Sequence, residues 1–305
     1  MSELLSRNGM VATQLARRLL GLELGGKLPR VRDLAASLGV GNGTIQAGLQ
    51  VLEQVGAIEV IARGSLGTFL VTANRSQLWE LAGLGSLTVA LPLPYSRRYE
   101  GLATGIRDAL AELSIPFSIS YIRGSVERLN AVVSGAIDIA VVSGLAFDLL
   151  SAELPIMSLA DLGPRTYVGS HGIVLAPGST IEGNALKVAI DRTSADQVHL
   201  VESLFADRND VEFFETSYHQ LSREFAQQIV NATVWNLDEL EERFAAPVEV
   251  LPLPPSAGIG RNTNAVLAIR EGNERIPRVL FETLDLALIK QVQKDVISGS
   301  RIPSY

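Results

Sequence analysis

The stretch that decides the fold of the N-terminal part is residues 28–71, LPRVRDLAASLGVGNGTIQAGLQVLEQVGAIEVIARGSLGTFLV. It contains two short segments of helical apolar periodicity, separated by a glycine-containing turn, and then two β-rich runs around glycines. This is the order of a winged helix-turn-helix, in which the second helix of the motif enters a DNA major groove. The sequence therefore predicts an N-terminal DNA-binding domain.

A helix is also expected before this stretch, because apolar side chains recur there every three or four residues. They are Val11, Leu15, Leu19 and Leu22. Pro29 suits the start of a second helix, and Gly39, which tolerates a positive φ, suits its end. The side chains of this second helix that are expected to face inward are Val31, Leu34, Ala35 and Leu38.

The third helix is expected to begin at Gly41 or Asn42 and to bury Ile45, Leu49 and Leu52. The side chains predicted on its opposite face are Gly43, Thr44, Gln46, Ala47 and Gln50. After it, residues 57–62 and 68–71 have the composition of two strands joined by a turn at 63–67.

These landmarks resemble the N-terminal reader domain of the GntR family of bacterial transcription regulators. The resemblance implies a set of DNA-contacting residues, namely Arg30, Arg32, Asn42, Thr44, Gln46, Gln50, Arg63 and Gly67. Arg32 matches the family arginine that meets the DNA backbone or a base, and Arg63 with Gly67 matches the tip of the wing. The alternative is a small helical domain used only for dimerisation.

The predicted recognition helix departs from the family pattern in two places. Gln46 stands where the family usually has a base-reading arginine, and Gly41-Asn42 replace the usual Ser-Arg pair. Amide side chains pair best with the edges of adenine, so we expect a preference for A·T steps at Gln46 or Gln50.

Charge is distributed unevenly along the chain. Residues 1–76 carry eight Lys/Arg and five Asp/Glu, a net charge of +3, whereas the remainder carries 18 basic and 28 acidic residues, a net charge of −10. A basic head on an acidic body orients the chain on a polyanion. Because affinity grows with the number of phosphates neutralised, a head of +3 is expected to bind operator DNA as a homodimer over two half-sites.

Length and composition indicate a two-domain protein. The 305 residues, 47% of them apolar, suffice for two cores, and we expect domains at 1–73 and 86–305 with a linker at 74–85. The chain has no cysteine, which excludes disulfides and thiolate metal sites. No signal peptide and no apolar run long enough to span a bilayer is evident, so a cytoplasmic protein without membrane association is expected.

Residues 86–305 alternate between strand and helix patterns, which predicts an α/β domain with a largely parallel sheet. The expected strands are 87–91, 117–122, 137–142, 167–176, 186–190, 232–235, 248–253 and 265–270. The expected helices are 96–113, 125–133, 195–205, 217–230 and 276–297.

The run Ser134–Val141, SGAIDIAV, resembles a recurring piece of type 2 periplasmic-binding-protein folds, which also serve as effector domains of LysR-type regulators. Together with Pro92–Gly101, PLPYSRRYEG, it resembles the C-terminal domain of YhfZ-type regulators. The resemblance implies two α/β lobes facing each other across a ligand cleft. A generic doubly wound α/β domain is the alternative.

Hydroxyl groups or glycines follow several predicted strands, at the ends where ligands bind in such folds. Helix N-termini there favour an anion, so we predict a small anionic effector. The candidate ligand-binding residues are Tyr95, Ser96, Gly124, Ser125, Ser143, Arg192, Thr193, Ser194 and Asn236. The arginines considered as anchors are Arg97, Arg123, Arg165 and Arg192. Alternatively, the hydroxyls are helix caps, the arginines are solvated, and Trp235 packs in the core rather than stacking on a ligand.

No catalytic residues, metal ligands or cofactor are predicted, since His171, His199 and His219 have no metal-ligand spacing. The sequence therefore favours a ligand-responsive bacterial transcription regulator over an enzyme. Two alternatives stay open: an enzyme built on a periplasmic-binding-protein fold, and a DNA-binding protein whose C-terminal domain only oligomerises.

Overall fold

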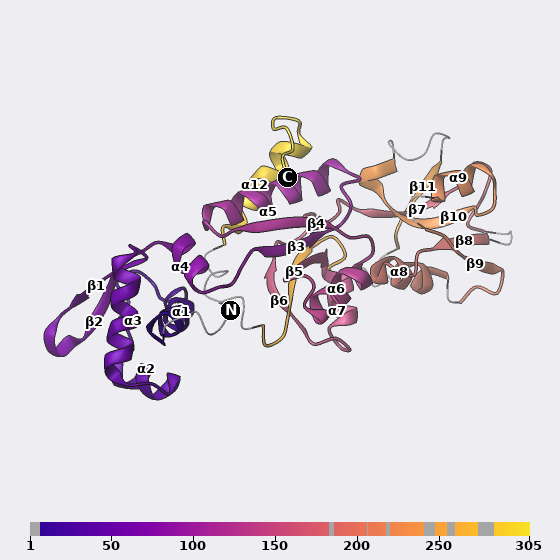
Figure 1. The fold of residues 1–305 in the computed structure, drawn as a ribbon. Coiled ribbons are helices and arrows are strands. Elements are labelled where there is room, and N and C mark those ends of the chain that lie inside the picture. Colours follow the sequence, from indigo (N-terminus) through magenta and orange to yellow (C-terminus); the bar gives the residue numbers. More distant parts are fainter. Residues whose placement is uncertain are drawn as a thin grey trace. The chain divides into compact units, whose positions relative to one another are not determined.

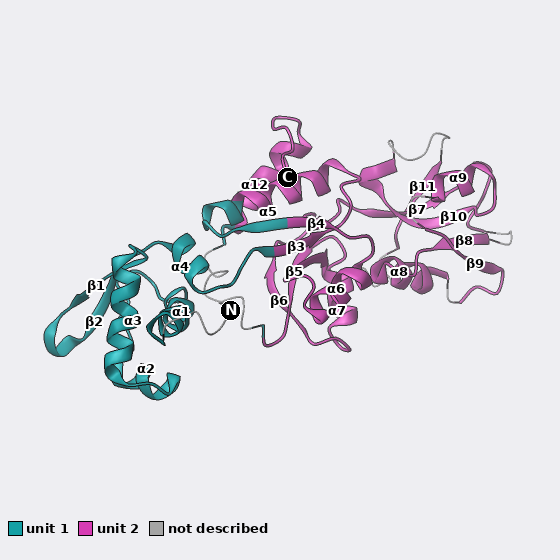
Figure 2. Cartoon of the chain, viewed as in Figure 1, with its two compact units in different colours: residues 1–87, 109–118, 273–285 teal, residues 88–108, 119–272, 286–305 magenta. Residues whose placement is uncertain are grey.

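The computed structural model describes residues 7–182, 186–205, 207–217, 220–240, 248–254, 260–273 and 284–305. It divides into two compact units (Figure 2). Unit 1 comprises residues 1–87, 109–118 and 273–285, and unit 2 comprises residues 88–108, 119–272 and 286–305. The domain boundaries at 73 and 86 stay a prediction.

The head in unit 1 is a winged helix-turn-helix, as predicted (Figure 1). Its helices are α1 (Arg7–Leu19), α2 (Val31–Leu38) and α3 (Asn42–Gln54). Strands β1 (Ile58–Ala62) and β2 (Thr68–Ala73) follow as an antiparallel hairpin, and α4 (Arg75–Leu81) comes next. Trp79 on α4 is buried and donates its indole N–H to the Gly85 carbonyl at 2.5 Å.

Glycines position the two helices of the motif. Gly39 ends α2 in the left-handed conformation with φ of 65°, and Gly41 precedes the first turn of α3. Gly48 faces α1 so closely that an added Cβ would lie 3.0 Å from Leu15 and 3.1 Å from Val11. The prediction for α2 was partly wrong, since Leu34 and Ala35 are buried but Val31 and Leu38 are only half-buried on this eight-residue helix.

The tip of the wing is a 3₁₀ turn, η2 (Gly64–Leu66). Gly67 closes it with φ of 104°, and a Cβ there would lie 2.7 Å from the Lys27 side chain. The Arg63 guanidinium stacks 5.0 Å from the centre of the Phe69 ring. The backbone of Lys27 forms an isolated antiparallel β-bridge with that of Phe69. Arg63 and Lys27 are therefore held against the hairpin near the tip of the wing.

The first lobe of the C-terminal part is built on a five-stranded sheet in the order β4-β3-β5-β12-β6. Its strands are β3 (Leu87–Leu91), β4 (Phe117–Tyr121), β5 (Ile139–Ser143), β6 (Ile156–Asp161) and β12 (Ala265–Arg270). Its helices are α5 (Arg97–Glu112), α6 (Ser125–Ser134), α7 (Gly144–Leu150) and α12 (Leu286–Ile297). Of the helix predicted at 276–297, residues 276–283 lie outside the described residues.

The second lobe has its own five-stranded sheet in the order β11-β7-β10-β8-β9. Its strands are β7 (His171–Leu175), β8 (Leu186–Ile190), β9 (Val211–Glu215), β10 (Ala232–Asn236) and β11 (Glu249–Pro252). Helices α8 (Ala195–Phe205) and α9 (Leu221–Ala226) pack on it, and η3 (Leu237–Glu239) follows β10. The helix predicted at 217–230 is thus shorter than expected.

The prediction of a largely parallel sheet was wrong, because both sheets are mixed. In the first lobe β3 and β5 are parallel, but β12 runs antiparallel to both β5 and β6. In the second lobe β8 is parallel to β9 and β10, whereas β7 is antiparallel to β10 and β11. The antiparallel strands β7 and β12 each follow a passage of the chain from one lobe to the other. The sequence of a single strand does not show where the chain crosses between lobes, so the direction of these strands could not be predicted.

Two glycines let α5 and α12 pack with their backbones close together. A Cβ at Gly105 would lie 2.7 Å from the Ile289 carbonyl oxygen, and one at Gly101 would lie 3.0 Å from the Gln293 Cα. The buried Gln293 side chain donates to the carbonyls of Arg98 and Thr166. Within the described residues, no helix combines the length and the apolar character needed to cross a bilayer.

Candidate functional site

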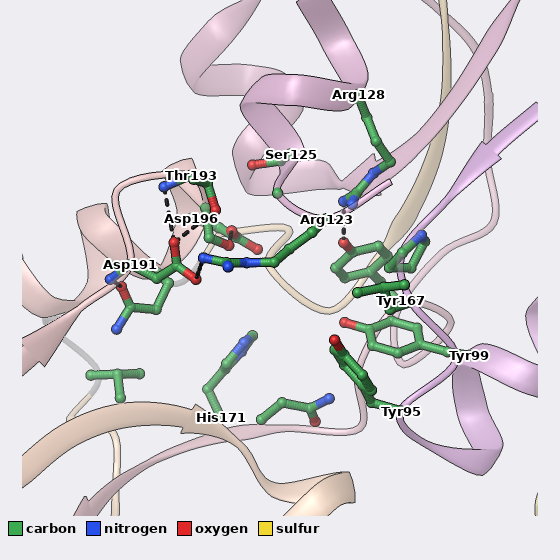
Figure 3. A pocket seen from close by; sticks show the side chains of 17 residues that line it. Tyr95, Tyr99, Arg123, Ser125, Arg128, Tyr167, His171, Asp191, Thr193 and Asp196 are labelled. Atoms are coloured by element: carbon green, nitrogen blue, oxygen red, sulfur yellow. Dashed lines mark hydrogen bonds and ion pairs between the residues drawn. The ribbon is translucent and has the colours of Figure 1, made fainter. Parts of the chain in front are cut away.

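A pocket opens between the two lobes of unit 2, at the ends of β3, β8 and β10 and the starts of α6 and α8 (Figure 3). Its cavity volume is about 90 Å³. Its lining is formed by Pro92, Leu93, Tyr95, Tyr99, Arg123, Gly124, Ser125, Arg128, Tyr167, His171, Asp191, Thr193, Ser194, Asp196, Gln197, Val234 and Asn236.

The lobes meet directly where α6 and α8 begin. The Ala195 N–H donates to the Ser125 hydroxyl oxygen at 3.0 Å, and the Val126 N–H donates to the Thr193 carbonyl at 3.3 Å. Gly124, with φ of 78°, makes this approach possible, since a Cβ there would lie 2.6 Å from the Thr193 oxygen. Any side chain at position 124 would force the two lobes apart.

An ion pair crosses between the lobes beside these helix starts. Arg123 of the first lobe donates to the Asp191 carboxylate of the second at 2.8 Å (Figure 3). The other Asp191 oxygen accepts from the N–H and the hydroxyl of Thr193 at 3.1 Å and 2.7 Å. The Arg123 Nε is buried and has no partner among the described residues, so part of this guanidinium is available within the site.

A second guanidinium, that of Arg128, is 2% exposed and lies on the inward face of α6. It donates to the carbonyls of Val141 and Ile122 at 2.9 Å and 2.7 Å, and to the Tyr167 hydroxyl at 2.8 Å. These contacts fix its position at the pocket wall. Burial raises the pKa of Tyr167, which keeps this phenol protonated.

Tyrosine rings form the side of the pocket that faces the acidic residues (Figure 3). Tyr99 and Tyr167 meet edge to face, with ring centroids 5.3 Å apart, and Tyr95 lies next to them. Such rings offer apolar faces to a ligand together with hydroxyl groups at their edges.

His171, the first residue of β7, lies on the pocket floor opposite Arg123 (Figure 3). Its Nδ1 is 3.1 Å from the Asn262 amide nitrogen. Burial lowers the pKa of His171 below its ordinary value of 6.5, and the carboxylates of Asp196 and Asp238 oppose this shift. The imidazole is therefore neutral at pH 7.

We expect His171 to make the folded chain sensitive to acid. Its pKa is lower when folded than when unfolded, so the unfolded chain takes up the proton first and stability is lost as the pH falls below 6.5. Replacing His171 with glutamine should flatten the fall of the unfolding free energy between about pH 6.5 and 5, measured by urea unfolding. His199→Gln is the matched control, and equal flattening in both variants would exclude the buried imidazole as the cause.

The structure brings six of the nine predicted ligand-binding residues to the pocket, together with Arg123. They are Tyr95, Gly124, Ser125, Thr193, Ser194 and Asn236. The amide of Asn236 is already engaged, since it accepts from the Asp238 N–H and donates to Glu239. That any of these side chains binds a ligand stays a prediction.

Three predicted residues are not among the lining side chains. Ser96 and Ser143 accept hydrogen bonds from the N–H groups of Tyr99 and Ala146, so each caps a helix start. Arg192 points elsewhere, with a mostly exposed guanidinium 3.8 Å from Glu215. The other anchors considered, Arg97 and Arg165, also lie outside the lining, and Trp235 packs in a hydrophobic core.

Sequence reasoning missed the remaining lining residues, above all Arg128, Asp191, Asp196 and His171. A signal for Arg128 was present, because it shares a helix face with the apolar Leu129 and Val132, and a charged residue on a buried face needs partners. The other three belong to the second lobe and come together only when its sheet and α8 assemble, which no local pattern contains.

The predicted DNA-contacting residues gather on the α2–α3 surface and the wing. Arg30, Arg32, Asn42, Gln46, Gln50 and Arg63 are exposed, while Thr44 and Gly67 are partly buried. The Arg32 guanidinium lies 3.3 Å from Asp33, and both side chains are more than half exposed. Such an exposed pair is weak, so Arg32 is available to another anion. Their role in DNA binding stays a prediction.

Within the described ranges, no group of three or more His, Asp or Glu side chains has the arrangement of a metal site. The geometry is that of a helix-turn-helix head joined to a two-lobed domain, with a pocket between the lobes that contains charged side chains. Comparisons with known proteins agree with this class. The sequence profile of the YhfZ C-terminal domain matches residues 74–305, and that of a helix-turn-helix domain matches residues 23–70.

The chain belongs to the YhfZ family. It is 33% identical to the uncharacterized protein YhfZ of Escherichia coli strain K12 over 301 residues, which cover 99% of this chain and 98% of the relative. The crystal structure of YhfZ from Shigella flexneri is similar with a TM-score of 0.61 and 32% identity, over 75% of this chain and 97% of that one.

The C-terminal domain has the type 2 periplasmic-binding-protein fold, as predicted. The periplasmic aliphatic sulphonate binding protein SsuA of Escherichia coli matches with a TM-score of 0.53 and 15% identity, over 70% of this chain and 75% of that one. At this identity the likeness concerns the fold alone.

Proposed function

We propose that this protein is a cytoplasmic, ligand-responsive bacterial transcription regulator rather than an enzyme. In this proposal its head binds operator DNA as part of a homodimer, in the manner of a GntR winged helix, and the pocket between the lobes binds a small effector that carries an anionic group. The observation that carries the proposal is the combination, in one chain, of a helix-turn-helix head with a two-lobed domain whose pocket is lined by two arginines.

The anionic group is inferred from the donors that meet in the pocket. Arg123 and Arg128 supply guanidinium N–H groups, and the starts of α6 and α8 add the partial positive charge of two helix N-termini. A guanidinium binds a carboxylate or phosphate through two parallel hydrogen bonds. These donors favour a small carboxylate or phosphate ester over a neutral molecule.

Effector binding is coupled to DNA binding in this proposal through the arrangement of the two lobes. A ligand that contacts both lobes stabilises one arrangement over another, and it shifts DNA affinity only by its difference in affinity for the two, typically about 1–3 kcal/mol. The test is to select duplexes from a random DNA library with the full chain and to titrate them with and without effector. A chain that selects no duplex would exclude the proposal.

Arg32→Ala is expected to weaken binding of the selected duplex and to reduce its salt dependence by about one phosphate contact. Gln46→Ala should instead change which bases are selected, because an amide reads base edges. Arg75→Ala, an exposed arginine on α4 outside the predicted interface, is the control and should leave both properties unchanged. A salt slope in Arg32→Ala equal to that of the parent would remove Arg32 from the interface.

A further inference from the structure

The pocket contains two buried charged side chains that lack an oppositely charged partner. Arg128 is 2% exposed and Asp196 is 5% exposed. Within the described part of the chain, the recorded acceptors of Arg128 are two carbonyls and a phenol, none of them a carboxylate. In the same part of the chain, Asp196 has one recorded hydrogen bond, from the Ser194 hydroxyl at 2.8 Å, and no ion pair.

The other two charged residues of the pocket differ in this respect. Arg123 and Asp191 form an ion pair at 2.8 Å, and Thr193 satisfies the second Asp191 oxygen. His171 cannot neutralise Asp196, because burial keeps its imidazole uncharged at pH 7. Arg128 and Asp196 are therefore the two charged residues of the pocket that could form an ion pair with a bound ligand.

Buried charges without an ion-pair partner are costly, which makes two of them at the wall of one pocket informative, although the N-terminus of α8 offsets part of the cost for Asp196. Three of the five N–H groups of the Arg128 guanidinium are used, so it retains two donors for a ligand. Asp196 is a carboxylate and offers only acceptors. An anion alone would satisfy Arg128 but would be repelled by Asp196, whereas a molecule carrying both charges would satisfy both.

We propose that the effector is a small zwitterion, with a carboxylate bound by Arg128 and a protonated amine bound by Asp196. This inference rests on the proposed function and specifies the effector of the same pocket. Tyr95 and Tyr99 line the same pocket and offer ring faces to the apolar part of the molecule. Amino acids are the common class of small metabolite that carries both groups.

The first experiment measures binding of the twenty standard amino acids to the full-length chain by thermal shift and then by calorimetry. For the tightest binder, two analogues follow: the acid that lacks the amine and the amine that lacks the carboxylate. We expect at least one amino acid to bind, and each analogue to bind roughly tenfold to a hundredfold more weakly, since each loses a hydrogen-bonded charge.

The second experiment uses Asp196→Asn, which keeps the size of the side chain but removes its charge. The amino acid should bind this variant roughly tenfold to a hundredfold more weakly, while the analogue without the amine should bind as well as it binds the parent or better. Asp207→Asn makes the same change at an exposed position and should leave both affinities unchanged.

The outcomes separate this inference from the proposed function. If the acid without an amine binds the parent as tightly as the amino acid, the effector is a simple anion, and the zwitterion is excluded while the regulator stands. If no amino acid binds, the zwitterion is likewise excluded. If amino acids bind but the full chain selects no DNA, the regulator is excluded while the ligand class stands.

Discussion

Replacing Arg128 with methionine is expected to lower the free energy of unfolding by about 3 kcal/mol, because three buried hydrogen bonds are lost, and to abolish effector binding. The guanidinium is almost fully buried and donates to two backbone carbonyls, those of Val141 and Ile122, and to the Tyr167 hydroxyl. Methionine fills much of the same volume but leaves these oxygens without donors in the protein interior, where each lost hydrogen bond costs about 1–3 kcal/mol.

Urea unfolding followed by circular dichroism measures the loss of stability, and calorimetry measures effector binding. The matched control is Arg192→Met, which removes an exposed guanidinium with one distant ion-pair partner and should change stability by less than about 0.5 kcal/mol. Arg128→Lys keeps the charge without the planar fork, and it should be intermediate. If Arg192→Met lost effector binding and Arg128→Met kept it, the pocket would be assigned to the wrong arginine.

Gly105→Ala is expected to lower the free energy of unfolding by about 2–3 kcal/mol, a large effect for one added methyl group. The new Cβ would lie 2.7 Å from the Ile289 carbonyl oxygen and 2.9 Å from the Ile289 Cα. Both atoms belong to the backbone of α12, so no side-chain rotation relieves the overlap. The helix must shift, and its packing against α5 must loosen.

The control for Gly105 is Gly43→Ala, because that glycine also lies in a helix but has no atom within 4 Å of an added Cβ. Alanine is the better helix former, so Gly43→Ala should be neutral or stabilise by up to about 1 kcal/mol. Thermal unfolding of both variants gives the comparison. A Gly105→Ala variant as stable as the parent would mean that α5 and α12 do not pack as closely as described.

Local signals were sufficient where an element is defined by its own residues. The predicted spans 87–91, 195–205 and 265–270 coincide with β3, α8 and β12. The end of α2 at Gly39 follows from the need for a left-handed residue, which glycine supplies at little cost. Such features are decided within a few residues of the chain and are readable before any tertiary contact exists.

Two strands and a helix were missed because their patterns are weak. β6 and β9 are edge strands of their sheets, and β9 is largely exposed, so neither has the apolar run of a central strand. The seven residues of α7 are too few to establish a helical period. The antiparallel direction of β12 could not be predicted either, because the sequence of an apolar strand does not show whether it pairs parallel or antiparallel with its neighbours.

The residues of the candidate site also fall into those that a local pattern predicted and those that it missed. Gly124, Ser125, Thr193 and Ser194 were found because a glycine or hydroxyl after a strand marks a helix start. Asp191 and His171 were not found, because they lie at the ends of second-lobe strands, just after β8 and at the start of β7, and these ends are recognisable as part of a pocket only after the sheet has formed. The predicted anionic effector relied on the helix starts and ignored Asp196, whose buried carboxylate changes the expected ligand from an anion to a zwitterion.

The position of β12 determines when the pocket can exist during synthesis. This strand lies between β5 and β6 in the first-lobe sheet, yet the ribosome makes it only after the whole second lobe. At roughly 5–20 residues per second, the head and the second lobe emerge seconds before the first lobe receives this strand. A nascent or truncated chain can therefore have a folded helix-turn-helix head while its first lobe, and with it the pocket, is still incomplete. For the proposed regulator, such a chain would bind operator DNA without responding to the effector.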